Sequence, residues 1–215
     1  MKATLLGATG LIGGHILYDL IQDEDYTSVT LIVRRPFDSP HPKINVKVID
    51  FKDQNAFKSA IEPESIMFCA VGTTRKKVKG DMQKYRQVDY DIPVIAAKLG
   101  LERECSTFSL VSAIGANSNS SNFYTKLKGE VEDEVLSLGY PKLHIFRPSI
   151  LLGNRSEKRL GEKIAQILMP IFSFLLPNKY KPVHAKDVGT AMVRASKITT
   201  EGLKVYTYKE IQELV

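Results

Sequence analysis

The chain begins with a glycine-rich segment that lies between an apolar run and a helix-like pattern. Residues 6–13 read L-G-A-T-G-L-I-G and follow the apolar residues 3–6 directly. In a strand-turn-helix unit, Gly7 permits a tight turn, Gly10 lets a pyrophosphate approach the backbone, and Gly13 lets the helix pack on the strand. The phosphates then lie at the positive N-terminal end of the helix, so the spacing predicts a dinucleotide site. The other residues of this segment expected at the cofactor are Thr9, Leu11 and Ile12.

Apolar, β-branched runs alternate with helical patterns along the rest of the chain. This order indicates βαβ units, so we expect an α/β fold, a Rossmann-type doubly wound parallel sheet with a small C-terminal lid region. The expected strands are residues 2–6, 28–33, 46–49, 65–71, 107–112, 142–147 and 204–206. The expected helices are residues 11–21, 54–61, 82–99, 124–138, 161–175 and 185–195. Residue types at the helix ends predict an N-cap at Asp53 and C-termini at Gly100 and Gly139.

The length of the chain suits one such domain. A chain of 215 residues is long enough to bury a substantial core. We expect a single NAD(P)-binding domain over residues 1–215, in which residues 151–182 form a small segment that covers the substrate. Because no run of about 18 apolar residues occurs, we expect no membrane span.

The charge of the chain does not point to a nucleic-acid partner. The net charge of +6 arises from 30 basic and 24 acidic residues spread along the sequence. The cluster R-K-K-V-K at residues 75–79 is expected to be a solvated loop, with an anion contact as the alternative. No recognition helix, zinc finger or aromatic RNA motif accompanies it, so we expect no nucleic-acid binding.

The cysteines and histidines carry little functional signal. Cys69 and Cys105 are too few for a disulfide framework and fit a reducing compartment, so we expect a cytoplasmic protein. The four histidines show no metal-ligand spacing with cysteine or carboxylate. We therefore expect no metal site.

Three residues in the middle of the chain form a candidate catalytic set. Tyr124 and Lys128 stand four residues apart at the start of an expected helix, which places both side chains on one helical face. Ser112 ends the preceding strand. Because ligands of open α/β sheets bind at the carboxyl ends of the strands, we expect these residues at the cofactor site.

The motifs together resemble the short-chain dehydrogenase/reductase superfamily, of the atypical kind. They comprise G-A-T-G-L-I-G, R-R after the second strand, D-F after the third, C-A-V-G-T-T-R after the fourth, V-S-A-I-G-A with Y-T-K-L-K, and F-R-P-S-I-L-L-G. The last three blocks, with V-D-Y at residues 88–90, most resemble the Tat-interacting oxidoreductase-like proteins, which are NADPH-binding relatives of the reductases.

The candidate set suits carbonyl reduction. A free phenol is a poor base at neutral pH, but a Lys128 ammonium and an oxidised nicotinamide would favour the phenolate form of Tyr124. In the reductive direction, Tyr124 would donate a proton to the substrate oxygen while Ser112 hydrogen-bonds that oxygen. The resemblance implies that Lys128 also binds the nicotinamide ribose. The alternative is that the three residues have only structural roles: Ser112 as a hydroxyl at a strand end, Tyr124 as a residue of an amphipathic helix and Lys128 as a solvated charge.

The end of the second strand predicts the cofactor. NAD sites place Asp or Glu there, whereas this chain has Arg34 and Arg35, whose guanidinium groups suit a 2′-phosphate. NADP(H) is therefore favoured over NAD(H), with an ordinary surface pair as the alternative. The resemblance implies further cofactor contacts, near the adenine from Asp50 and Phe51, along the riboses from Val71, Gly72 and Thr73, and beside the nicotinamide from Pro148 and Ser149.

The sequence thus predicts an NADPH-dependent oxidoreductase of short-chain type that acts on a small carbonyl or alcohol. One alternative is an NADP(H)-binding regulatory or redox-sensing protein without turnover, with a protein as its partner. Another is a sugar-nucleotide epimerase-like enzyme, although the enzymes so resembled usually carry a larger C-terminal domain and prefer NAD. A monomer and a homodimer are both compatible with the sequence.

Overall fold

The central element of the fold is a parallel β-sheet. The computed structural model describes residues 1–153, 177 and 180–215. Within these residues, seven strands lie in the order β3-β2-β1-β4-β5-β6-β9, and every neighbouring pair is parallel. The strands are β1 (Lys2–Leu6), β2 (Ser28–Val33), β3 (Ile44–Val48), β4 (Ile66–Cys69), β5 (Thr107–Val111), β6 (Lys142–Phe146) and β9 (Gly202–Tyr206). The strand order reverses between β1 and β4, which is where such sheets bind ligands.

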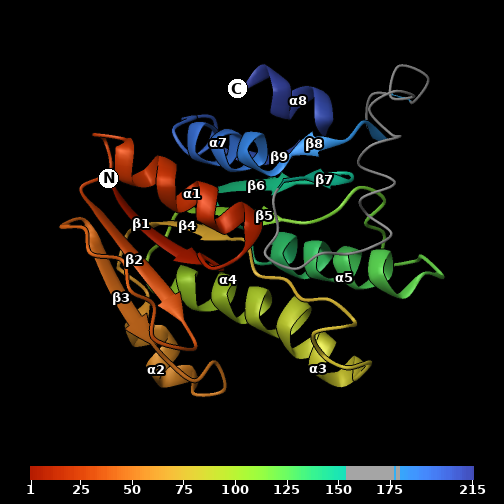
Figure 1. Cartoon of the computed structure of the whole chain (residues 1–215), viewed down its shortest axis with the longest axis horizontal. Coiled ribbons are helices and arrows are strands. Elements are labelled where there is room, and N and C mark those ends of the chain that lie inside the picture. The colour runs from red at the N-terminus through yellow and green to blue at the C-terminus, as the bar shows by residue number, and fades with distance from the viewer. Residues whose placement is uncertain (154–176, 178–179) are drawn as a thin grey trace.

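Helices cover both faces of the sheet (Figure 1). One face packs against α1 (Leu11–Gln22), α7 (Ala185–Ala195) and α8 (Tyr208–Glu213), and the other against α2 (Gln54–Ala60), α4 (Ile92–Glu102) and α5 (Phe123–Ser137). Two apolar cores result, because each strand sends alternate side chains to opposite faces. In β1, for example, Leu5 belongs to the first core and Leu6 to the second. The expected doubly wound Rossmann fold is confirmed.

The expected strands are all present; β1 and β2 have the expected ends, and the ends of the others differ by no more than two residues. Four of them, β1, β2, β5 and β6, begin at the expected residue. Asp53 caps α2 as expected, because its carboxylate accepts a 3.0 Å hydrogen bond from the amide of Ala56. The expected helix 161–175 and most of the expected substrate-covering segment lie outside the described residues. The ends of that segment belong to two short strands that were not expected, β7 (Leu151–Leu152) and β8 (Val183–His184), which pair in parallel.

The expected continuous helix 82–99 is wrong in detail. The chain instead forms α3 (Met82–Arg86), a π-helix η1 (Gln87–Asp91) and then α4. Pro93 stands in the first turn of α4. A proline has no amide hydrogen to donate, and in a regular helix its ring clashes with the carbonyl four residues earlier, here that of Asp89. The wider π-turn before Pro93 accommodates the proline without ending the helical path.

Gly100 does not end a helix as expected, since α4 continues to Glu102. Its role is close packing. A Cβ atom at this position would lie 2.2 Å from the sulfur of Met67 and 2.5 Å from the hydroxyl of Tyr140. Gly139 does follow the end of α5 and has a φ of +73°. The presence of a glycine in the sequence therefore does not show whether a helix ends there or packs closely against a neighbouring element.

The short helix α8 was not expected, although its sequence carries a helix-start signal. Thr207 and Glu210 form a capping box, in which the carboxylate of Glu210 accepts a 2.8 Å hydrogen bond from the amide of Thr207. In the described part of the chain, no helix combines the length and apolar character needed to cross a membrane.

The buried histidine of β6 makes the stability of this fold dependent on pH. Burial lowers the pKa of His144 to about 4 from 6.5, and the charges of Lys204 and Lys142 act in the same direction. As the pH falls from about 6.5 to about 4, the unfolded chain binds a proton that the folded chain does not bind. The free energy of unfolding should therefore fall by up to about 3 kcal/mol across this window.

Denaturant unfolding at both ends of the window tests this expectation. His144→Phe should lose less stability on acidification than the wild-type chain, whereas His41→Gln, a change in the loop after β2, should lose as much. Equal losses in the wild-type chain and His144→Phe would contradict the assignment to this imidazole.

Candidate functional site

The glycine loop after β1 fits tightly against the loop after β4. Gly7 has a φ of +90°, and a Cβ atom there would lie 2.6 Å from the carbonyl of Ala70. A Cβ atom at Gly13 would lie 2.0 Å from the carbonyl oxygen of Gly7. Gly10 is the N-cap of α1 and, having no side chain, leaves the first amides of this helix open to an anion. The three glycines thus have the close backbone contacts and the open helix N-terminus that a dinucleotide-binding loop requires.

Two neighbouring glycines of α1 provide a matched test of this loop. Gly13→Ala should lower the free energy of unfolding by about 1–3 kcal/mol, because the added methyl group overlaps the backbone of Gly7. Gly14→Ala should be neutral or stabilising by up to about 1 kcal/mol, because its Cβ atom meets only the oxygen of Ala8, at an ordinary distance of 3.7 Å. Thermal unfolding of both variants checks this. Equal stability of the two would show that the loop is not tightly fixed.

A cavity of about 1050 Å³ opens at the carboxyl ends of β1, β4, β5 and β6. It is large enough for a cofactor together with a small substrate. The expected site residues that line it are Thr9, Gly10, Leu11, Ile12, Val71, Gly72, Thr73, Ser112, Tyr124, Lys128, Pro148 and Ser149. The structure therefore brings together the expected phosphate loop, the expected nicotinamide contacts and the candidate catalytic set.

The candidate catalytic residues come from two elements. Ser112 directly follows β5 and is 4% exposed, and its Oγ has no hydrogen-bond partner within the described residues. Asn122 caps α5 by accepting a 2.9 Å hydrogen bond from the amide of Tyr124, which fixes the first turn of the helix. Tyr124 as a residue is 41% exposed, whereas Lys128, one turn further, is buried. An unsatisfied hydroxyl in a cavity wall is suited to bind a ligand oxygen.

A buried carboxylate holds Lys128. The Nζ atom of Lys128 lies 3.1 Å from Oδ1 of Asp89, and Oδ2 of Asp89 accepts a 2.7 Å hydrogen bond from the amide of Thr73. Burial disfavours the ammonium form of Lys128, but Asp89, with smaller contributions from Tyr124 and Cys69, offsets this effect, and the pKa of Lys128 is raised. Burial also raises the pKa of Asp89, against the opposing effects of Lys128 and the Thr73 amide.

Asp89 is a site residue that the sequence interpretation missed. It belongs to the V-D-Y block at residues 88–90, which contributed only to the family resemblance. The sequence analysis expected a continuous helix here, and such a helix did not predict that the Asp89 side chain would face Lys128. The π-helix that Pro93 imposes places it there.

A second ion pair holds α5 one turn further along the helix. Arg147, at the end of β6, donates from Nε to both carboxylate oxygens of Glu132, at 3.0 and 3.1 Å, and its Nη2 atom contacts Oε2 as well. Glu132 is buried, and the side chain of Arg147 is about one-third exposed. Because Pro148 follows Arg147 directly, this pair connects the expected nicotinamide wall to α5.

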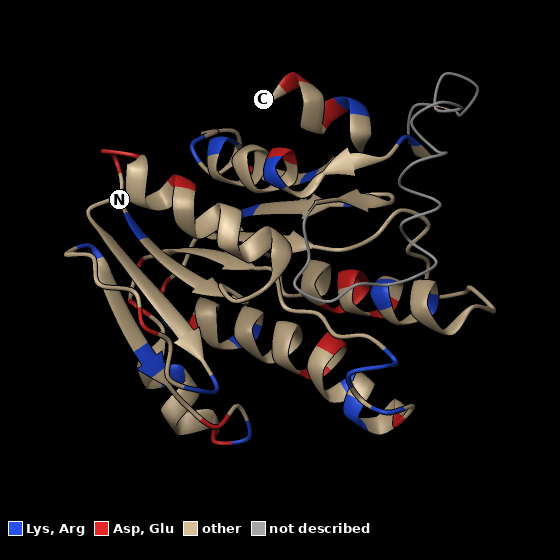
Figure 2. Cartoon of the chain, viewed as in Figure 1, with Lys and Arg blue, Asp and Glu red and all other residues tan. Residues whose placement is uncertain are grey.

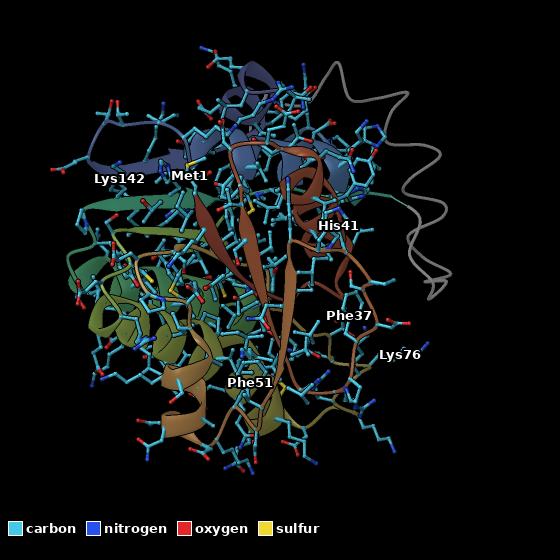
Figure 3. All side chains as sticks on the ribbon, turned by 90° about the vertical axis from the view of Figure 1, so that its left-hand side faces the viewer. Met1, Phe37, His41, Phe51, Lys76 and Lys142 are labelled. Carbon is cyan, nitrogen blue, oxygen red and sulfur yellow. The ribbon has the colours of Figure 1, made fainter. Side chains whose placement is uncertain are left out.

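The residues expected at the adenine end lie outside the lining of this cavity. Arg34 and Arg35 follow β2 and are exposed, and neither guanidinium has an ion-pair partner in the described part of the chain. The carboxylate of Asp50 accepts a hydrogen bond from the amide of Lys52. Phe51 packs edge-to-face on Phe57 with ring centroids 5.0 Å apart. Figure 3 views this side of the molecule and labels Phe51, which follows β3, and Phe37 and His41 of the loop after β2.

The basic cluster at residues 75–79 lies in the loop between β4 and α3 (Figure 2). Its charged side chains are exposed, and Lys77 lines the cavity. The expected solvated loop and the alternative anion contact are thus both compatible with its position. Among the described residues, no group of His, Cys, Asp or Glu is arranged to hold a metal ion.

A parallel sheet of this order, with an open helix N-terminus and a glycine loop at its reversal point, defines a dinucleotide-binding protein. The profile of a family described as NAD(P)H-binding matches residues 7–138. The chain belongs to this NAD(P)H-binding family, and its resemblance to the atypical short-chain dehydrogenases/reductases is confirmed.

Two curated relatives are similar over most of their length. The mitochondrial protein FMP52 of Candida albicans is 33% identical over 199 residues, which are 90% of this chain and 86% of that protein. Protein HTATIP2 of Rattus norvegicus is 34% identical over 194 residues, 89% of this chain and 77% of that protein. The second match confirms the resemblance to the Tat-interacting oxidoreductase-like proteins.

Solved structures confirm the fold. The crystal structure of gox2253 superposes with a TM-score of 0.73 at 21% identity and covers 95% of this chain and 68% of its own. MoeE5 in complex with UDP-glucose and NAD superposes with a TM-score of 0.71 at 14% identity, covering 98% of this chain and 79% of its own. At these identities the similarity concerns the Rossmann architecture.

The expected cytoplasmic location is wrong. The FMP52 relatives from several yeasts are named mitochondrial proteins. The expectation depended on two cysteines, and both are buried free thiols in the structure. A low number of cysteines argues only against a disulfide framework, and it does not distinguish one reducing compartment from another.

Proposed function

We propose that this protein is an NADPH-dependent oxidoreductase of short-chain type that acts on a small carbonyl or alcohol. The observation that carries the proposal is that Ser112, Tyr124 and Lys128 line the same cavity as the glycine loop. A protein that only binds a nucleotide has no need of a hydroxyl, a phenol and an ammonium group at the nicotinamide end. Membership of an NAD(P)H-binding family supports the cofactor class.

The residues present fit the cofactor. The open amides at the start of α1 suit a pyrophosphate, and the Lys128 ammonium suits ribose hydroxyls. Arg34 and Arg35, exposed at the end of β2 without ion-pair partners in the described residues, suit a 2′-phosphate. This last feature favours NADP(H) over NAD(H).

The reaction follows from the chemistry of these side chains. A reduced nicotinamide, when bound, supplies the hydride. Tyr124 donates its phenolic proton to the carbonyl oxygen, and the buried Ser112 hydroxyl donates a hydrogen bond to the same oxygen as negative charge develops there. The Lys128 ammonium stabilises the phenolate that remains on Tyr124. Because the Tyr124 ring is partly exposed, solvent can return the proton.

Titration of the purified protein with NADPH and NADH, followed by a panel of carbonyl substrates, tests the proposal. Tight binding of NADPH and substrate-dependent loss of the reduced-nicotinamide absorbance are expected. Tight binding without turnover across the panel would favour the regulatory alternative. Interconversion of a sugar nucleotide with no net cofactor oxidation would favour the epimerase-like alternative, and absence of binding would reject all three.

A further inference from the structure

Asp89 occupies an unusual position for an acidic residue. It is 1% exposed and lies in the π-helix η1, one turn before Pro93. Its two carboxylate oxygens contact different walls of the cavity, since Oδ1 faces Lys128 of α5 and Oδ2 accepts from the amide of Thr73 in the loop after β4. Burying a carboxylate is costly unless it is paired and hydrogen-bonded, and Asp89 meets both conditions.

The ionisable groups around the Lys128 ammonium come from three elements. They are Asp89 of η1, Cys69 of β4 and Tyr124 of α5 itself. Burial raises the pKa of the Cys69 thiol to about 11, so this group is neutral near neutral pH. The phenol of Tyr124 carries a proton before it acts as the acid. The carboxylate of Asp89 is therefore the negative charge that offsets the burial of Lys128.

We propose that Asp89 is a positioning residue that keeps Lys128 charged and fixes it, together with the Thr73 backbone, in the arrangement that the nicotinamide ribose requires. The proposal deepens the proposed function and rests on it for the role of Lys128 at the cofactor. Asp89 itself has no direct role toward substrate or cofactor. It acts through the lysine and through the loop.

The variant Asp89→Asn removes the negative charge of this side chain while keeping its size and shape nearly unchanged. Its amide oxygen can still accept from Thr73, but the negative charge is lost. With the Asp89 charge gone, burial of Lys128 moves the pKa of the ammonium downward. As the pH rises, Lys128 loses its proton earlier than in the wild-type protein. The pH above which NADPH affinity declines should therefore move down by about 1–3 units.

Fluorescence titration with NADPH over a range of pH values measures this shift. Asp91→Asn is the matched control, because it removes the same charge from the same π-helix two residues further on. We expect the wild-type pH profile for Asp91→Asn and a profile displaced to lower pH for Asp89→Asn. Coincident profiles for the wild-type protein and Asp89→Asn would overturn the proposal, even if the affinity of the variant is uniformly lower.

A double-mutant cycle on folding tests the pair without any ligand. Asp89→Asn and Lys128→Gln each leave one buried charge unpaired, whereas the double variant leaves none. The double variant should have a higher unfolding temperature than either single variant. Additive losses of stability would overturn the proposal. If the wild-type protein binds no NADPH, the proposed function fails, and this cycle still decides whether Asp89 holds Lys128.

Discussion

Replacing Tyr124 with phenylalanine is expected to lower the turnover number for a carbonyl substrate by a factor of about 100 to 10,000. The change deletes one oxygen atom, the donor of the transferred proton. Asn122 caps α5 through the backbone amide of residue 124, so the helix start does not depend on the phenol. Because the ring remains and Lys128 is untouched, the affinity for NADPH should change by less than about twofold.

Steady-state kinetics and NADPH titration on the same preparation check this result. Tyr208→Phe, at the start of α8, deletes the same atom outside the cavity lining and is the control. A loss of NADPH affinity equal to the loss of turnover would contradict the assigned role, because it would mean that the phenol serves binding. Full activity of Tyr124→Phe would reject the proposed acid outright.

Replacing Arg34 and Arg35 together with alanine is expected to weaken NADPH binding by about 10- to 100-fold while leaving NADH binding nearly unchanged. A charge-assisted hydrogen bond to a phosphate is worth about 1.5–3 kcal/mol, and one guanidinium on the 2′-phosphate accounts for the expected loss. Both side chains are exposed and free of ion pairs in the described part of the chain, so their removal should not destabilise the fold.

Parallel calorimetric titrations with NADPH and NADH measure this preference. Lys47→Ala, in the neighbouring strand β3, removes one exposed positive charge and controls for general electrostatic attraction. Equal weakening of both cofactors by the double arginine variant would show that the pair does not discriminate between them. An unchanged NADPH affinity would identify it as an ordinary surface pair.

The sequence predicted the sheet because its signals are local. β1 and α1 were predicted from the glycine spacing between them. The structure explains this spacing, because a side chain at Gly7 or Gly13 would overlap neighbouring backbone. The division of the helix before Pro93 was not predicted, since the periodicity of apolar residues continues through a π-turn. Gly100 was misinterpreted because its meaning depends on Met67 and Tyr140, which are distant in sequence.

The candidate site was predictable where a residue sits at the end of a strand or the start of a helix. That logic selected Ser112, Tyr124 and Lys128, which line one cavity, and their catalytic roles stay a prediction. Asp89 was not selected, because its importance arises from a pairing across 39 positions of sequence that a helical pattern does not reveal. Buried ion pairs of this kind become visible only when the elements are packed together.

The two ion pairs on α5 have a consequence for redesign. Asp89 holds Lys128 and Arg147 holds Glu132, and these two positions of α5 are one helical turn apart on the same face. Ile150 and Leu151, which also line the cavity, take no part in these two pairs that anchor the helix with the proposed acid. Libraries directed at a new substrate should vary those positions and leave α5 intact, because chemistry and selectivity are assigned to separable parts of the chain.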